Sequence, residues 1–361
     1  MKQTMKLIGS LAIAIISLMP QILQGQDSTQ MKTRSVQVGF ITPLGSNGFN
    51  SGNIVNKFSV NLLAGYAGGV DGAEFSGLVS VLRNSMTGAQ FSGLANINTC
   101  KTTGFQASGL ANINTDTTRG FQNAGLVNLS KGGKVTQISG LANISTGSIK
   151  GLQMAGLINV STSRVVGAQI TGLLNYSDKL NGVQIGVINI SDSLERGVPI
   201  GFLSFVRNGY KAFEIGATET LYGVLSFKTG TRQFYNILSV GSGSRNGLSL
   251  FAWGYGLGTY IPVGKKAGIS IDGLCYQVNE GEWFTNRLNL LNKINITGSW
   301  RVAAHLSVFA GLSWNVTVSD ITDEYGDKVV SHFTPWSVYD ETYNGYLNVK
   351  MYPGVSMGLR L

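Results

Sequence analysis

Hydrophobic and polar residues alternate in a short unit that recurs seven times between Gly88 and Ile190. In the copy GFQASGLANIN, which begins at Gly104, apolar and small residues take alternate positions, while glutamine, serine and asparagine take the positions between them. Leu110 is the one exception to this alternation. The glutamines are spaced by 16 or 15 residues, at Gln90, Gln106, Gln122, Gln137, Gln153, Gln169 and Gln184. A short fixed period indicates a chain built by stacking one small structural unit.

Two β architectures fit a unit of this length, which is too short for a helix plus a strand. In a β-solenoid each unit is one coil, and in a transmembrane barrel each unit is one strand and a turn. The asparagines recur at almost one phase, which favours a parallel ladder of stacked amides. A further apolar site, two residues before the first glycine of a unit, fits a third inward side of a coil: Met86, Ile149, Val165 and Leu180. We therefore expect an all-β protein with a β-solenoid, and one large transmembrane β-barrel is the alternative.

Beyond Phe205 the repeat ends and longer alternating strands follow. The predicted strands are Tyr210–Thr218, Thr220–Thr229, Gln233–Gly241, Gly247–Ile261, Ala267–Val278, Arg287–Trp300, Val302–Val318 and Gly345–Leu361. Most are long enough to cross a hydrocarbon layer when tilted. The last one alternates up to a hydrophobic final residue, Leu361, where outer-membrane barrels usually end in an aromatic residue. About eight antiparallel strands predict a small barrel whose interior is filled by side chains, so that it is not an open pore.

The N-terminus has the features of a secretory signal peptide. Lys2 and Lys6 precede the apolar run from Leu7 to Met19, and the predicted cleavage site follows Gly25. The expected organisation is a signal peptide (1–25), an N-terminal strand and loop (26–55), a β-repeat domain (56–209) and an outer-membrane-type barrel (210–361). We therefore expect the protein to be exported.

Composition narrows the function classes further. Charged residues make up 12% of the chain and the formal net charge is +9, spread without a basic run. This excess suits anionic surroundings such as lipid headgroups. Nucleic acid is not an expected partner, because no basic stripe is interleaved with aromatic residues. Cys100 and Cys275 lie in different regions outside any CxxC motif, which argues against a disulfide or a metal site.

Candidate catalytic and metal-binding residues are few. His305 shares a predicted strand face with Ser307 and Ser313, but no carboxylate is placed to orient the ring, so we expect it to fill the barrel lumen. Lys228–Gly230 matches one motif of penicillin-recognising enzymes without the SxxK partner. An acidic loop lacks the EF-hand spacing: Asp320, Asp323, Glu324 and Asp327. We expect no catalytic residues, no cofactor, no metal and no enzymatic activity.

The GxQxxGLxN units closely resemble the leptospiral-type bacterial surface-repeat family of exported Gram-negative proteins. The resemblance covers roughly Phe58–Phe205, and Thr220–Leu361 looks like the barrel-like tail of some members. It implies a location in the cell envelope and provides no binding residues. We expect a non-enzymatic outer-membrane or cell-surface protein, in which a barrel anchors a repeat rod. Its expected partners are outer-membrane lipid and an unknown protein or glycan ligand. A porin-like channel is the alternative if the repeats are barrel strands.

Overall fold

The computed structural model describes residues 31–321 and 331–361. The predicted signal peptide lies outside the described residues. The chain divides into two compact units, one ending at Phe202 and the other spanning Leu203–Leu361. Both units are built of β-strands, as the sequence predicts.

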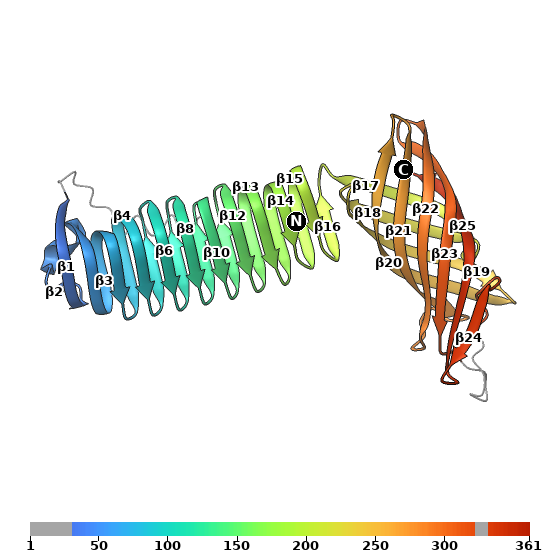
Figure 1. Ribbon diagram of the computed structural model, residues 1–361, viewed down its shortest axis with the longest axis horizontal. Helices are drawn as coiled ribbons and strands as arrows, with labels where there is room; N and C mark the ends of the chain where they lie inside the picture. Colours follow the sequence, from blue (N-terminus) through green and yellow to red (C-terminus); the bar gives the residue numbers. More distant parts are fainter. Residues whose placement is uncertain (1–30, 322–330) are drawn as a thin grey trace. The chain divides into compact units, whose positions relative to one another are not determined.

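The first unit is a stack of coils (Figure 1). Its elements are β1 (Lys32–Ile41), β2 (Leu44–Gly45), the 3-10 helix η1 (Gly48–Asn53), β3 (Ile54–Ser76), β4 (Val79–Ser92), β5 (Ala95–Asn98), β6 (Thr102–Ser108), β7 (Ala111–Asn114), β8 (Thr118–Ala124), β9 (Val127–Ser130), β10 (Gly133–Ser139), β11 (Ala142–Ser145), β12 (Ile149–Ala155), β13 (Ile158–Thr171), β14 (Leu174–Ile185) and β15 (Ile188–Ile200).

Successive coils pair in parallel and in register. Gln106 of β6 lies opposite Gln90 on one side and Gln122 on the other. Asn112 of β7 is likewise opposite Asn96 and Asn128. The β-solenoid prediction is therefore confirmed. One large barrel is wrong for the repeats, because neighbouring strands of such a barrel run antiparallel.

The stack begins earlier than the repeat motif suggests. Strand β1 pairs in parallel with β3, with Val38 opposite Val60, and therefore forms the first rung of the solenoid. Strand β2 pairs antiparallel with the other side of β1, with Gly45 opposite Gly39, which also lies opposite Asn61 of β3. Terminal units of repeat proteins differ in sequence because one side of them lacks a neighbouring repeat. This explains why the residues before 56 lack the motif although they belong to the stack.

The first glycine, present in every unit except the one that begins at Val135, lies where neighbouring coils approach closely. Gly120 has a φ of +134°, and a Cβ atom there would lie 1.9 Å from the carbonyl oxygen of Gly104. Side chains other than hydrogen avoid this φ and cannot fit this space. Glycine thus sets the spacing between coils.

The second unit is a closed antiparallel barrel (Figure 1). The barrel sheet contains β17 (Tyr210–Thr218), β18 (Gly223–Gly230), β19 (Tyr235–Arg245), β20 (Leu248–Val263), β21 (Ala267–Glu280), β22 (Asn289–Ala303), β23 (Leu306–Ser319), β24 (Tyr339–Tyr343) and β25 (Leu347–Arg360). The short strand β16 (Leu203–Val206) precedes them in the chain and is not part of the barrel sheet. The sheet runs in chain order from β17 to β23, then to β25, which also pairs with β17 and closes the ring. Strand β24 pairs with β25 outside this ring of eight strands. The predicted small barrel is confirmed.

One predicted strand runs across a turn. The alternating run Val302–Val318 was expected to be one strand, but β22 extends to Ala303 and β23 begins at Leu306. A tight hairpin therefore separates them at Ala304 and His305. Such hairpins usually contain glycine, asparagine or aspartate, and this one contains none, so the sequence carries no turn signal.

Candidate functional site

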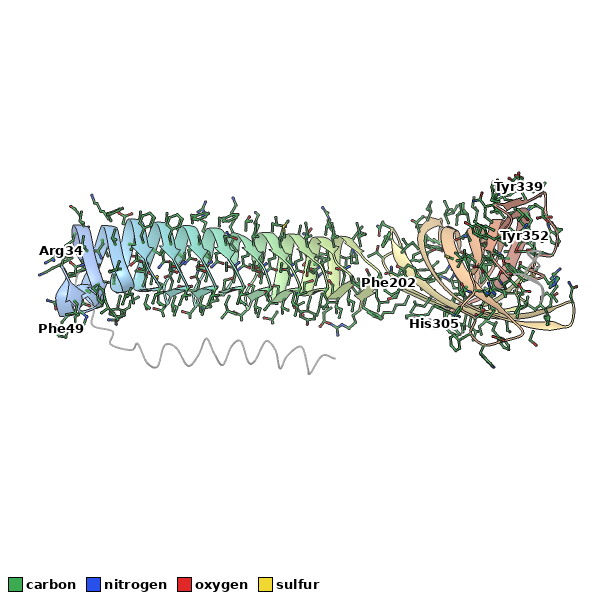
Figure 2. The ribbon with its side chains drawn as sticks, turned by 90° about the horizontal axis from the view of Figure 1, so that it is seen from below. Arg34, Phe49, Phe202, His305, Tyr339 and Tyr352 are labelled. Carbon is green, nitrogen blue, oxygen red and sulfur yellow. The ribbon has the colours of Figure 1, made fainter. Side chains whose placement is uncertain are left out.

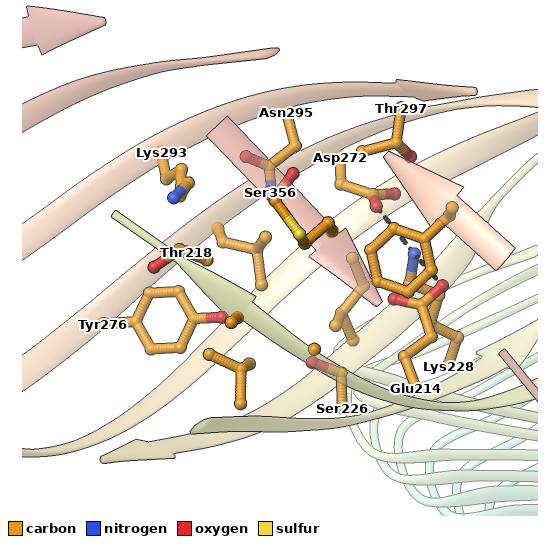
Figure 3. A pocket seen from close by; sticks show the side chains of 17 residues that line it. Glu214, Thr218, Ser226, Lys228, Asp272, Tyr276, Lys293, Asn295, Thr297 and Ser356 are labelled. Atoms are coloured by element: carbon orange, nitrogen blue, oxygen red, sulfur yellow. Dashed lines mark hydrogen bonds and ion pairs between the residues drawn. The ribbon is translucent and has the colours of Figure 1, made fainter. Parts of the chain in front are cut away.

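Ion pairs occupy the interior of the barrel (Figure 3). The Nζ atom of Lys228 lies 2.9 Å from a carboxylate oxygen of Glu214 and 2.7 Å from one of Asp272. The Nε atom of Arg360 donates to Glu214 over 2.6 Å. Each of these side chains is less than 10% exposed. Two cations thus balance two anions, which offsets the cost of removing all four charges from water.

A second ion pair lies in the same interior. The Nζ atom of Lys293 is 3.0 Å from Glu219, whose other oxygen accepts a hydrogen bond from the backbone N–H of Val355 over 2.8 Å. The hydroxyl of Tyr235 donates to Asp272 over 2.6 Å. The cavity left between the two ion-pair groups measures about 40 Å³. Small-molecule sites are on the order of ten times larger, so this space suits only a few water molecules.

The outer surface of the barrel is apolar. The residues opposite to the polar inward positions are large hydrophobic side chains exposed by 39% or more, such as Ile215, Leu238, Trp253, Ile271, Ile294, Ile296, Leu312, Trp314, Met357 and Leu359. Water-soluble barrels have the reverse arrangement, with polar residues outside. The interior holds these charged and polar groups beside a buried apolar cluster that includes Leu250, Val278 and Leu291. Polar groups inside and an apolar exterior are typical of barrels that cross a membrane.

The two ends of the barrel differ in their connections. At the end where β17 begins and β25 finishes, the turns are short: 231–234, 264–266 and 304–305. At the other end the connections are 219–222, 246–247, 281–288 and the much longer 320–346. Outer-membrane barrels have short turns on the periplasmic side and longer loops outside the cell. Because the number of ring strands is even, the chain enters and leaves the barrel at the short-turn end.

The solenoid interior holds two columns of side-chain amides. In the glutamine column each Nε2 donates to the Oε1 of the preceding coil, as Gln122 does to Gln106 over 3.0 Å. In the asparagine column each Nδ2 donates to the following coil, as Asn112 does to Asn128 over 2.9 Å. All these amides are fully buried. Because each of these buried donors meets an acceptor in a neighbouring coil, the polar interior incurs little desolvation cost.

A carboxylate ends the glutamine column at its N-terminal side. Glu74 takes the glutamine position of its coil and accepts hydrogen bonds from Gln90 over 3.3 Å and from Ser80 over 2.5 Å. Burial raises the pKa of Glu74 to about 6, and hydrogen bonds from Ser80, Gln90, Ser59 and Asn61 oppose this rise. The solenoid therefore contains one titratable group among its buried amides.

The outer surface of the solenoid is apolar along one edge and on both sheets. At the tight turn of each coil an apolar side chain projects outward, exposed by 39% to 64%. We call this column the leucine edge: Leu62, Leu78, Leu94, Leu110, Leu126, Leu141, Leu157, Leu173, Val187 and Phe202. Figure 2 shows side chains projecting outward along the whole stack. The exception to alternation at Leu110 was the sequence signal for this edge.

The residues weighed as catalytic or metal-binding do not form a site. His305 lies exposed in the hairpin between β22 and β23, so the prediction that it fills the lumen is wrong. Lys228 of the Lys-Thr-Gly motif is held in the barrel ion pairs. Cys100 and Cys275 are free thiols. Asp320 is described, while the other three acidic residues of that loop lie outside the described residues. Within residues 31–321 and 331–361 there is no cluster of metal-binding side chains.

Comparison of the chain with protein families, with curated proteins and with solved structures finds no match. Among the described residues, no helix is both long and apolar enough to span a bilayer. The inward ion pairs and the leucine edge are the features that sequence reasoning missed. The ion pairs could not be found, because pairing across a lumen depends on strand register.

Proposed function

We propose that this chain is a non-enzymatic outer-membrane protein in which the barrel anchors the solenoid as a structural or binding rod. The observation that carries the proposal is the inverted barrel, with charged pairs such as Lys228–Asp272 inside and residues such as Ile294 and Trp314 outside. Five strands, β20 to β23 and β25, have 14 to 16 residues. This exceeds the roughly 9–11 residues that a tilted strand needs to cross a hydrocarbon core.

The connection lengths support one orientation. The short-turn end of the barrel would face the periplasm, and the solenoid, which precedes β17 in the chain, would be on the same side of the membrane. In this orientation the rod acts inside the envelope, and the long connection 320–346 faces the outside. Proteolysis of intact cells tests this orientation. A solenoid in the periplasm should stay uncut, whereas a solenoid outside the cell should be cut.

The porin-like alternative requires the repeats to be barrel strands, but they pair in parallel as coils of a solenoid. The eight-stranded barrel is also filled by its own side chains and leaves about 40 Å³ between its ion-pair groups. Conduction of ions through such a barrel would require the buried pairs to separate.

Gel migration and conductance test the proposal together. The protein refolded into detergent or vesicles should migrate faster without boiling than after boiling, as a closed barrel does. In planar bilayers it should give no stable single-channel conductance. A band that does not shift on boiling, with the protein remaining in the soluble fraction, would contradict the membrane anchor. Stable conductance would contradict the rod function and favour transport.

A further inference from the structure

The charged residues of the repeats lie on the side of each coil away from the leucine edge. Between Phe58 and Phe202 every charged residue except Glu74 falls five to nine residues after the leucine-edge residue of its coil. We call this the basic edge, because basic residues outnumber acidic ones by nine to five. The basic residues are Arg83, Lys101, Arg119, Lys131, Lys134, Lys150, Arg164, Lys179 and Arg196, and the acidic ones are Asp71, Asp116, Asp178, Asp192 and Glu195.

Both sheet faces between these edges also carry apolar side chains. On one face Phe105 and Phe121 stack with ring centroids 5.4 Å apart, and Met154 is 38% exposed. On the other face Ile113 and Ile158 are partly exposed. Contiguous apolar surface of this extent on a soluble protein marks an interaction site.

Apolar side chains on the leucine edge and on both sheet faces favour a fluid partner over a rigid one. A second copy, or any other folded protein, covers one face and leaves the second sheet face in water. A lipid layer can cover the leucine edge and both faces at once, because acyl chains flow around the rod. The surplus of lysine and arginine on the opposite edge complements anionic headgroups, the pattern of interfacial membrane-binding elements.

The width of the coil fits this partner. Strand β6 has 7 residues, which span about 23 Å at about 3.3 Å per residue. One leaflet of a bilayer, with about 15 Å of hydrocarbon and its headgroup region, has a similar thickness of roughly 20 Å. When the leucine edge points into the acyl chains, the basic edge lies at headgroup level.

We propose that the solenoid docks sideways into a phospholipid layer with anionic headgroups, its leucine edge in the acyl region and its basic edge among the headgroups. The inference rests on the proposed function, since the barrel holds the rod at the same membrane. It adds a binding surface and a ligand class, phospholipid, to the rod itself.

Fluorescent probes on the full-length protein in vesicles test the docking. Exposed Cys275 is replaced by serine, while Cys100 stays, because burial raises the pKa of its thiol to about 12 and suppresses labelling. A polarity-sensitive probe is then attached to Leu126→Cys on the leucine edge, or to Thr117→Cys, an exposed position on the basic edge, as the matched control. The vesicles contain phosphatidylglycerol and phosphatidylcholine, with nitroxide groups on the acyl chains.

The acyl-chain nitroxides should quench the Leu126 probe several-fold more than the Thr117 probe, and aqueous iodide should do the reverse. Equal quenching of both probes by iodide would overturn the inference. The inference would also be overturned if the Leu126 probe were protected from iodide but not quenched by the nitroxides. If that protection disappeared at one protein copy per vesicle, the leucine edge would be an interface with a second copy. Heat-modifiable migration of the same samples shows separately whether the barrel has inserted. Failure of the proposed membrane anchor can therefore be distinguished from failure of the docking inference.

The charge contribution is tested by Lys131→Gln, Lys134→Gln and Lys150→Gln, which lie on the basic edge away from the leucine edge. Each change should weaken docking on anionic vesicles about fivefold, because a basic side chain near such a surface contributes about 1 kcal/mol. On pure phosphatidylcholine the three variants should match the parent protein. Unchanged docking on anionic vesicles would contradict the headgroup contact.

Discussion

Glu74 makes the stability of the solenoid depend on pH. Its pKa is raised from 4.5 to about 6 by burial, so the folded state binds the proton more tightly than the unfolded state. Stability from this group is fully present below pH 4.5 and is lost as the pH rises through 6. A shift of this size corresponds to a loss of about 2 kcal/mol. The side chain is fully buried, so solvent does not screen this loss.

The variant Glu74→Gln places the amide of the other coils at this position and should abolish this part of the pH dependence. The free energy of unfolding of the solenoid is measured by circular dichroism in guanidinium chloride at about pH 4 and about pH 7.5. Tryptophan fluorescence follows the barrel separately, because all five tryptophans lie in the second unit.

The difference between the two pH values should be about 2 kcal/mol smaller in the variant than in the unchanged protein. Asp71→Asn removes an exposed carboxylate of the same strand and should keep the original pH dependence. If Glu74→Gln and the unchanged protein lost stability in parallel, the assignment of this titration to Glu74 would be refuted.

Three other changes probe the coils and the barrel. Gln137→Glu removes a donor from the glutamine column and buries a second carboxylate, so the solenoid should lose about 3 kcal/mol near pH 7, measured by guanidinium unfolding. Gly120→Ala, which has no space for a methyl group, should also cost about 3 kcal/mol in that assay. Gly264→Ala, in an open turn of the barrel where φ is also positive, should cost the barrel less than about half as much, as followed by tryptophan fluorescence. Lys228→Met leaves Asp272 without its cation and should cost the barrel about 3–5 kcal/mol, seen as a lower temperature for the gel shift, and an unchanged temperature would contradict the pairing.

The repeat period and the common phase of the asparagines were sufficient to predict parallel coils, because only stacking in register places equal residues together. Alternation was sufficient to predict the barrel strands, but it carried no mark of the hairpin at His305. The first rung, with Gln37 buried in β1, was missed because it lacks the glycine motif. Contacts across the barrel lumen, such as Arg360 with Glu214, depend on closure and tilt, which local patterns do not encode.

The two amide columns have a consequence for how this protein can change length. Each coil offers the same acceptors and donors to the coil on either side, as the matched Gln122–Gln106 and Asn112–Asn128 bonds show. If one whole coil were removed or duplicated, the coils brought together would therefore still pair through the same hydrogen bonds. Gain and loss of genetic repeats can thus tune the reach of the rod in steps of one strand spacing, about 4.8 Å.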